Sequence, residues 1–195
     1  MTGSQPSPDL VGRLPQARAA LEFAESVHRG QSRAVDGAPF IEHPLEVGLL
    51  LRDAGAADHV IAAGVLHDTL EKTATDADEL RRRFGPTVAT LVAAVSEDPA
   101  VRGYRARKAA LRRQVAAAGE DAATIFAADK ISKARELRLG AGTGGARLRA
   151  RRLEHYRHCL GLLEELLGDT RLVRQLRAEL RALDRLATPA AIHGG

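Results

Sequence analysis

Apolar residues recur every three or four positions along most of this 195-residue chain, and this spacing constrains its fold more than any other feature. No segment shows the strict apolar and polar alternation that is typical of a half-buried strand. The sequence therefore predicts an all-α fold, a single domain with about eight to ten helices. The clearest amphipathic segments are residues 14–29, 104–118, 148–167 and 171–186.

Glycine and proline divide the remaining helical sequence. The dipeptide His43-Pro44 opens a helix that ends at Gly55, and residues 57–70 follow as one apolar helix with little charge. Asp76 or Thr75 can cap residues 77–84, with Glu79 in the capping-box position relative to Asp76, and residues 87–96 and 121–139 are two further helices. We expect a domain over residues 13–186, with flexible segments at 1–12, at the glycine-rich run 140–145 and at 187–195.

The composition excludes several classes of protein. No apolar stretch reaches the roughly 18 to 20 residues that span a bilayer. The single cysteine, Cys159, excludes an internal disulfide framework and, together with the absence of a signal-peptide pattern, favours a cytoplasmic protein. The net charge is +4, but acidic residues are interleaved with the basic ones and aromatic residues make up only 3%, so nucleic acid is disfavoured as a partner. The densest basic run, Arg147 to Arg152, is interpreted as a solvated helix face.

An adjacent histidine and aspartate, His67 and Asp68, lie in the most apolar predicted helix. Burying an ionised carboxylate there is unfavourable by several kcal/mol, unless a cation or hydrogen bonds compensate. With His43 and Asp129, which also border apolar helical runs, the pair makes a four-ligand nitrogen and oxygen set suited to manganese, iron or zinc. Spacing alone leaves open a second interpretation, with His43 as a helix cap and Asp129 as a surface ion-pair partner.

The order of several short motifs resembles the HD-type hydrolase domain of RelA/SpoT-like proteins, in particular the small alarmone hydrolases that remove the 3′-pyrophosphate from (p)ppGpp. The resemblance covers roughly residues 17–165. It is carried by residues 28–33, 37–44, 62–71, 80–85, 128–135 and 152–156 of this sequence.

The resemblance implies a role for individual residues. His43, His67, Asp68 and Asp129 match the ligands of a divalent metal, manganese first, with iron or zinc as alternatives. Glu71 matches an acid that positions and deprotonates the attacking water. The resemblance also implies three substrate-binding residues. Arg33 matches an arginine that packs against a guanine base, and Tyr156 matches a tyrosine that lines the nucleotide site. Arg135 belongs to the last strong motif.

Two lysines depart from the family pattern: Lys72 replaces an acid and Lys133 replaces an asparagine. Each follows a proposed ligand by four residues, Asp68 and Asp129 respectively, so each can share a helix face with it. The lysines can bind phosphate groups and take part in catalysis, or pair with the two aspartates and weaken metal binding, or point to solvent. We expect at least one of them to point into the pocket.

The sequence thus predicts a metal-dependent phosphohydrolase acting on (p)ppGpp or another phosphorylated nucleotide. The alternative is a catalytically degenerate HD-domain module that binds a nucleotide or regulates a partner. Alarmone synthesis is not expected, because the chain is too short for a second, synthetase domain. The amphipathic helices after Gly145 can pack on the domain or on a second copy, which leaves a homo-oligomer open.

Overall fold

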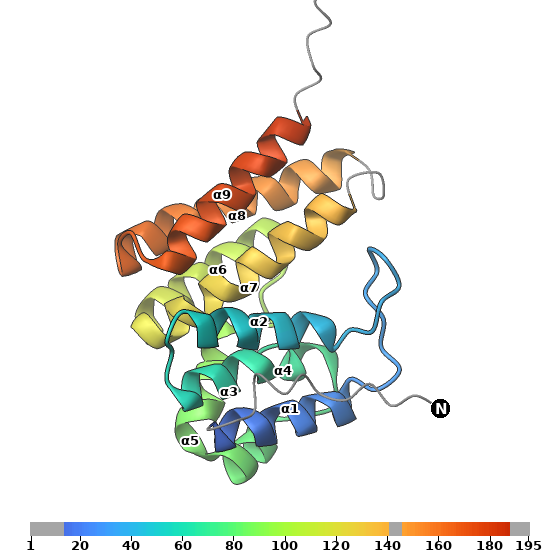
Figure 1. The fold of residues 1–195 in the computed structure, drawn as a ribbon, viewed down its shortest axis with the longest axis vertical. Helices are drawn as coiled ribbons and strands as arrows, with labels where there is room; N and C mark the ends of the chain where they lie inside the picture. Colours follow the sequence, from blue (N-terminus) through green and yellow to red (C-terminus); the bar gives the residue numbers. More distant parts are fainter. Residues whose placement is uncertain (1–13, 141–145, 188–195) are drawn as a thin grey trace, which may run out of the picture.

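The computed structural model describes residues 14–140 and 146–187 and confirms the predicted all-α fold. Within these ranges the chain forms nine helices, and its only strand-like feature is an isolated bridge between Ser32 and Pro39 (Figure 1). The helices are α1 (Pro15–Val27), α2 (Glu42–Asp53), α3 (Asp58–Leu66), α4 (Thr69–Lys72), α5 (Ala77–Val95), α6 (Tyr104–Ala118), α7 (Glu120–Leu139), α8 (Ala146–Leu167) and α9 (Arg171–Ala187).

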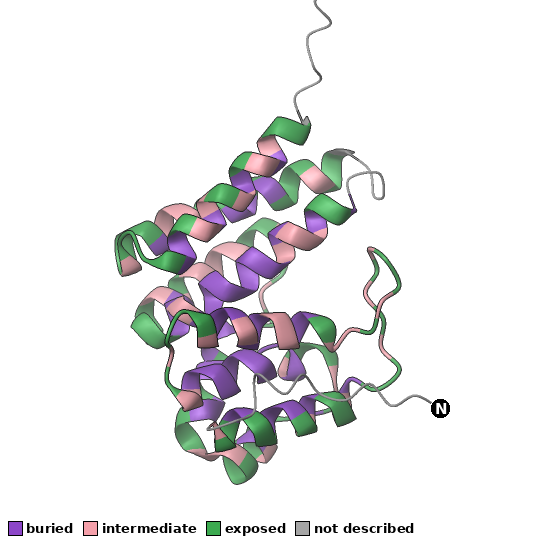
Figure 2. Cartoon of the chain, in the orientation of Figure 1, coloured by how far each residue is buried: buried purple, intermediate pink, exposed green. Residues whose placement is uncertain are grey.

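Two buried helices, α3 and α7, hold the bundle together. Helix α3 packs against α1, α2, α5 and α7, whereas α7 also contacts α6, α8 and α9. Most residues of α3 and of α7 are buried, and purple is the main colour of both helices in Figure 2. Gly64 allows α3 to approach α2 closely, because a Cβ atom at this position would lie only 2.2 Å from Leu51 Cδ1. The low charge of residues 57–66 therefore reflects burial on all sides.

The predicted single helix over residues 57–70 is wrong. Helix α3 ends at Leu66, a turn follows at His67 and Asp68, and α4 is a separate helix of four residues. The Thr69 hydroxyl donates to the Leu66 carbonyl at 2.7 Å and so occupies an acceptor that a continuous helix would use. The break places the adjacent His67 and Asp68 side chains on a turn, where both can reach one point.

The predicted capping and kink in α5 are confirmed. Asp76 has extended backbone angles, and its carboxylate accepts a hydrogen bond from the Glu79 backbone N–H at 2.7 Å. Gly85 interrupts the helix with φ +83°, a conformation that glycine adopts without strain, and Pro86 follows it. The Gly85-Pro86 pair thus separates two helical segments, as its sequence indicates.

The segments predicted to be flexible lie outside the described residues, apart from Gly140 and Ala187. None of the helices in the described ranges combines the length and the apolar character that crossing a bilayer requires.

Candidate metal centre and nucleotide pocket

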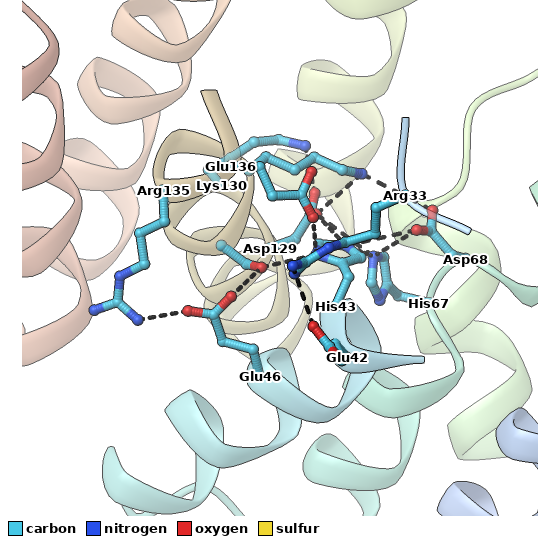
Figure 3. A network of polar contacts seen from close by, with 12 residues as sticks. Arg33, Glu42, His43, Glu46, His67, Asp68, Asp129, Lys130, Arg135 and Glu136 are labelled. Carbon is cyan, nitrogen blue, oxygen red and sulfur yellow. Dashed lines mark hydrogen bonds and ion pairs between the residues drawn. The ribbon is translucent and has the colours of Figure 1, made fainter. Parts of the chain in front are cut away.

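Three parts of the chain bring the predicted metal ligands together. His43 lies in the first turn of α2, His67 and Asp68 form the turn between α3 and α4, and Asp129 lies in the middle of α7. All four residues are buried, and none is more than 5% exposed. We call these four residues the carboxylate–histidine cluster; Figure 3 shows their side chains directed toward one another.

Ligand atoms of His43, His67 and Asp129 all lie within 4.8 Å of one another, and an Asp68 oxygen lies beside both histidines. The two histidine Nε2 atoms are 3.1 Å apart. Asp68 Oδ2 lies 3.5 Å from His43 Nε2 and 3.4 Å from His67 Nε2, and Asp129 Oδ1 lies 3.3 Å and 3.4 Å from the same atoms. Such separations suit donors that share an ion, since metal–ligand bonds are about 2 Å long.

The outer nitrogen of each ring shows where its proton lies. His67 Nδ1 is 2.8 Å from the Gly64 carbonyl, which can only accept, so this nitrogen carries a hydrogen. His43 Nδ1 lies 2.8 Å from the Ser132 hydroxyl and faces acceptors as well. Both inner nitrogens then direct lone pairs at the point that the two carboxylates share. Two lone pairs and two negative charges at one point require a positive charge there.

Two of the carboxylate oxygens support the same conclusion. Asp68 Oδ2 and Asp129 Oδ1 are buried and accept no hydrogen bond from the described residues. A buried polar atom without a partner is rare in a folded protein and often marks an ion site. A divalent ion would satisfy both oxygens and both nitrogens, so the residues present fit a metal with mixed nitrogen and oxygen ligands.

The electrostatics of the two histidines differ. Burial lowers the pKa of His43 to about 4, so its imidazole is neutral, as a metal ligand must be. Burial acts in the same direction on His67, but the carboxylates of Asp68 and Asp129 outweigh it and raise the pKa of this ring to about 9. The cluster thus favours a cation at its centre, either a proton on His67 or a metal that replaces it.

Lys133 enters this cluster, as expected of at least one of the two unusual lysines. Its Nζ lies 3.1 Å from Asp129 Oδ1 and 3.9 Å from Asp68 Oδ1. A second cation, Lys130, is buried and forms an ion pair with the other oxygen of Asp129. Although burial opposes ionisation, these two lysines hold the pKa of Asp129 well below its usual range.

A cavity of about 900 Å³ lies over the cluster, with His43 and Asp68 in its lining. Only four of the 29 basic residues in the chain are lysines, yet all four line this cavity. Lysine presents a compact charge on a flexible stem, so the cavity offers several ammonium groups to an anionic ligand. The four are Lys72, Lys108, Lys130 and Lys133.

The Lys72 side chain lies in the cavity wall and forms no ion pair with Asp68. Its Nζ sits 5.2 Å from the centre of the Phe40 ring, and its backbone carbonyl accepts a hydrogen bond from Gln31. The Lys72 backbone N–H donates to the Asp68 carbonyl at 3.0 Å, so the helical spacing is present, but the ammonium group lies over the Phe40 ring.

Two of the predicted catalytic and substrate-binding residues lie outside this cavity lining. The Glu71 carboxylate accepts a hydrogen bond from the Glu97 backbone N–H at 2.7 Å and lines a second, neighbouring cavity. The Arg135 guanidinium is bound to Glu46 at 2.6 Å and to Glu179 at 2.9 Å, in contact with α2 and α9. Neither side chain is placed to touch a ligand in the lysine-lined cavity.

Arg33 and Tyr156 do line the cavity, as does Arg152 from the basic run of α8. Two acids hold the Arg33 guanidinium, since Asp36 and Glu42 both pair with it. Tyr156 is only 6% exposed. Arg152, in the basic run that we interpreted as a solvated face, is exposed and also borders the cavity.

A second group of residues, which we call the cationic cluster, surrounds the buried His155: Lys108, Lys130 and Arg112. Arg112 Nη1 donates to His155 Nδ1 at 3.0 Å. Burial and the three neighbouring cations together lower the pKa of His155 to about 2. Sequence reasoning missed this cluster, whose only signal is the rarity of lysine in the chain.

Comparisons with known proteins agree with this fold and this site. A family model described as an HD domain matches residues 20–160. The chain is 32% identical over 171 residues to mouse guanosine-3′,5′-bis(diphosphate) 3′-pyrophosphohydrolase MESH1, covering 86% of this chain and 92% of the mouse protein. The chain therefore belongs to the HD-domain family. Within that family, the mouse relative confirms the resemblance to RelA/SpoT-like hydrolases of the small type.

Longer relatives share only this domain. The chain is 38% identical over 128 residues to a Streptomyces coelicolor GTP pyrophosphokinase and 37% identical over 122 residues to an Aquifex aeolicus guanosine-3′,5′-bis(diphosphate) 3′-pyrophosphohydrolase, covering 64% and 60% of this chain. It spans only 15% and 17% of those two proteins. Among solved structures, the fold matches a metazoan ortholog of SpoT with a TM-score of 0.77 at 24% identity, over 93% of this chain and 98% of that one.

Proposed function

We propose that this protein is a metal-dependent phosphohydrolase that removes the 3′-pyrophosphate from ppGpp or a closely similar phosphorylated nucleotide. The observation that carries the proposal is the convergence of two histidine nitrogens and two buried carboxylate oxygens beside a cavity lined by four lysines. The mouse and Aquifex relatives carry the name of this activity, which supports the choice of substrate.

Manganese is the ion that we propose for the cluster, with iron or zinc as alternatives. Two imidazoles and two carboxylates suit all three ions, whereas calcium and magnesium prefer oxygen ligands alone. When bound, such an ion lowers the pKa of a water molecule and polarises a phosphoryl group. The proposed donor set is His43, His67, Asp68 and Asp129.

The chain's own cations bind and orient the substrate in this proposal. Lys133 lies nearest the cluster and balances the negative charge that develops on the transferred phosphoryl group. Lys72 and Arg152 form no ion pair with a described carboxylate, so both are available to the remaining phosphates. In this proposal Arg33, which pairs with two acids, stacks on the base, and Tyr156 lines the nucleotide site.

One observation favours a second candidate, the degenerate binding module. The Lys133 ammonium group contacts both proposed carboxylate ligands, and a fixed positive charge at this place opposes a divalent ion. A chain that uses Lys133 in place of the metal would bind the nucleotide without hydrolysing it. For both the hydrolase and the binding module we propose a cytoplasmic location. Nucleotides of this kind and a free buried thiol such as Cys159 both suit that compartment.

The test combines metal content with turnover. Protein purified without chelator is analysed for metals and then assayed with ppGpp and Mn²⁺. The variant Asp68→Asn is treated in the same way. Its control is Asp78→Asn, which alters an exposed aspartate in a surface ion pair. We expect about one metal per chain, and a loss of both metal and activity in Asp68→Asn only. The rate should fall by roughly 1,000-fold or more, since metal catalysis contributes several kcal/mol and each 1.4 kcal/mol is tenfold. Nucleotide binding without metal or turnover would support the degenerate module instead.

A further inference from the structure

The orientation of the His43 ring depends on a chain of side chains that lies outside the cavity. His43 Nδ1 is 2.8 Å from Ser132 Oγ, and the Ser132 hydroxyl donates to Glu46 Oε2 at 2.6 Å. Figure 3 shows His43 and Glu46 rising from the same helix, α2.

The direction of these hydrogen bonds follows from the charges. Arg135 Nη1 donates to Glu46 Oε1 at 2.6 Å, so Glu46 is an ionised carboxylate and can only accept. The single proton of the Ser132 hydroxyl therefore goes to Glu46. The hydroxyl oxygen must then accept the Nδ1 proton of His43, and the Nε2 lone pair is left facing Asp68 and Asp129.

The chain continues to the last described helix. Arg135 Nε donates to Glu179 Oε1 at 2.9 Å, and Arg138 lies 3.6 Å from the other oxygen of Glu179. Ser132 is fully buried, and the Glu179 side chain is only 13% exposed. The contacts thus join α9, α7 and α2 to one imidazole, and they reach beyond residue 160, where the family match ends.

The two histidines of the cluster are held in different ways. His67 Nδ1 donates to a backbone carbonyl of its own helix, which no substitution of a side chain removes. His43 Nδ1 depends on the Ser132 hydroxyl, and the other nearby acceptor, Glu136 Oε1, lies at 3.5 Å, beyond good hydrogen-bond distance. The orientation of His43 is therefore the one that side-chain variants can change.

We propose that Ser132 and Glu46, with Arg135 and Glu179 behind them, are positioning residues that hold His43 with its Nε2 lone pair directed at the metal. This inference rests on the metal site of the proposed function, but not on its substrate. Partners behind a ligating histidine typically contribute about 10- to 100-fold to metal affinity. Arg135 thus acts on the metal ligand from behind, and not on the nucleotide.

The first experiment measures Mn²⁺ affinity of the full chain by calorimetry for the wild type, Ser132→Ala and Glu46→Gln. We expect both variants to bind Mn²⁺ about 10- to 100-fold more weakly. Ser132→Thr keeps the hydroxyl and should restore most of the affinity. The matched control is Glu164→Gln, which alters a carboxylate that pairs with Arg177 on the outer surface of α8 and α9, and its affinity should equal that of the wild type.

The second measurement reads the ring directly and needs no metal. Nitrogen-15 NMR of the histidine rings should place the His43 proton on Nδ1 in the wild type. In Glu46→Gln, Arg135 still donates to the side-chain oxygen, so the new NH₂ group faces Ser132 and favours reversal of the hydroxyl. The proton of His43 should then shift toward Nε2, a change that mere loss of packing would not produce.

The outcomes separate this inference from the proposed function. Wild-type affinity in folded Ser132→Ala and Glu46→Gln would overturn it, as would a wild-type His43 that carries its proton on Nε2, or a wild type that binds no Mn²⁺. If the affinities change as expected but ppGpp is not hydrolysed, the proposed substrate is wrong and the positioning role stands. Poor folding of a variant leaves the wild-type spectrum to decide the direction of the hydrogen bonds.

Discussion

Two buried histidine sites lie close to the same cavity and differ in one respect, the sign of the charge around them. His67 has two carboxylates beside it, and its pKa is raised to about 9. His155 is buried to a similar degree among Lys108, Lys130 and Arg112, and its pKa is lowered to about 2. Burial alone is therefore no sign of a metal ligand; the neighbouring charges decide which ion each site favours.

The difference divides the cavity into two kinds of surface. The carboxylate–histidine cluster favours a cation, and the cationic cluster favours an anion. Lys130 belongs to both, because its ammonium group pairs with Asp129 and also lowers the pKa of His155. A substrate with phosphate groups can span the two surfaces, one phosphate at the metal and another among the lysines.

The largest expected effect concerns the lysine that intrudes on the cation site. Lys133→Asn removes a positive charge about 3 to 4 Å from both carboxylates, and we expect Mn²⁺ to bind about 10- to 100-fold more tightly. Two unit charges 4 Å apart interact by roughly 4 kcal/mol at an effective dielectric constant of 20. We expect only a fraction of this repulsion between Lys133 and the ion, because a flexible lysine can move away from it. Calorimetry measures the change.

Lys72→Asn is the matched control for this charge. It lies at the same four-residue spacing from an aspartate, but forms no ion pair with Asp68, so its Mn²⁺ affinity should stay within about threefold of the wild type. Equal tightening in both variants would show that the overall charge of the cavity matters, and not the contact of Lys133 with the cluster.

The next effect concerns pH and the neutral His155. Its pKa in the folded protein is far below the usual 6.5, so the unfolded chain takes up a proton that the folded protein does not. Stability should therefore fall as the pH drops below about 6.5. His155→Gln removes this proton uptake, and between pH 6 and 5 it should lose about 1 kcal/mol less stability than the wild type, measured by urea unfolding. An identical pH slope in the two proteins would contradict the cationic surroundings described for His155.

The smallest effect concerns Glu71, which contacts neither cluster. Removal of a general base typically lowers the rate by about 100- to 10,000-fold. Because the Glu71 carboxylate is bound to the Glu97 backbone and lines the neighbouring cavity, we expect Glu71→Gln to lower ppGpp hydrolysis by less than about tenfold. Steady-state kinetics at saturating Mn²⁺ provide the measurement. A loss of more than 100-fold in the rate of ppGpp hydrolysis would contradict this expectation. It would support the role that the family resemblance implies for Glu71, which is to position and deprotonate the attacking water.

Local features of the sequence account for the helices and for the identity of the four clustered residues. The Asp76 cap, the Gly85-Pro86 kink and most helix boundaries follow from side chains close in sequence, and the structure confirms them. The family motifs then single out the histidines and aspartates. The break after Leu66 escaped prediction, because the Thr69 hydroxyl bond that marks it competes with an otherwise continuous apolar pattern.

The roles of the remaining polar residues depended on long-range contacts. Lys72 and Lys133 have the same spacing from an aspartate, yet only Lys133 forms an ion pair with one, because the Lys72 ammonium group lies over the Phe40 ring. Glu71 and Arg135 bind partners that are distant in sequence. Glu71 accepts a hydrogen bond from the Glu97 backbone, and Arg135 pairs with Glu46 and Glu179.

By itself, the sequence determined that this protein is helical and predicted which histidines and aspartates form a site, because helical periodicity and the order of short motifs are local properties. Only the tertiary structure decided which charges meet. Glu46, Ser132 and Glu179 are scattered over three helices, and nothing in their spacing links them to His43. A hydrogen bond across 89 residues of sequence exists only once α2 and α7 have packed together, and that packing depends on the whole buried core.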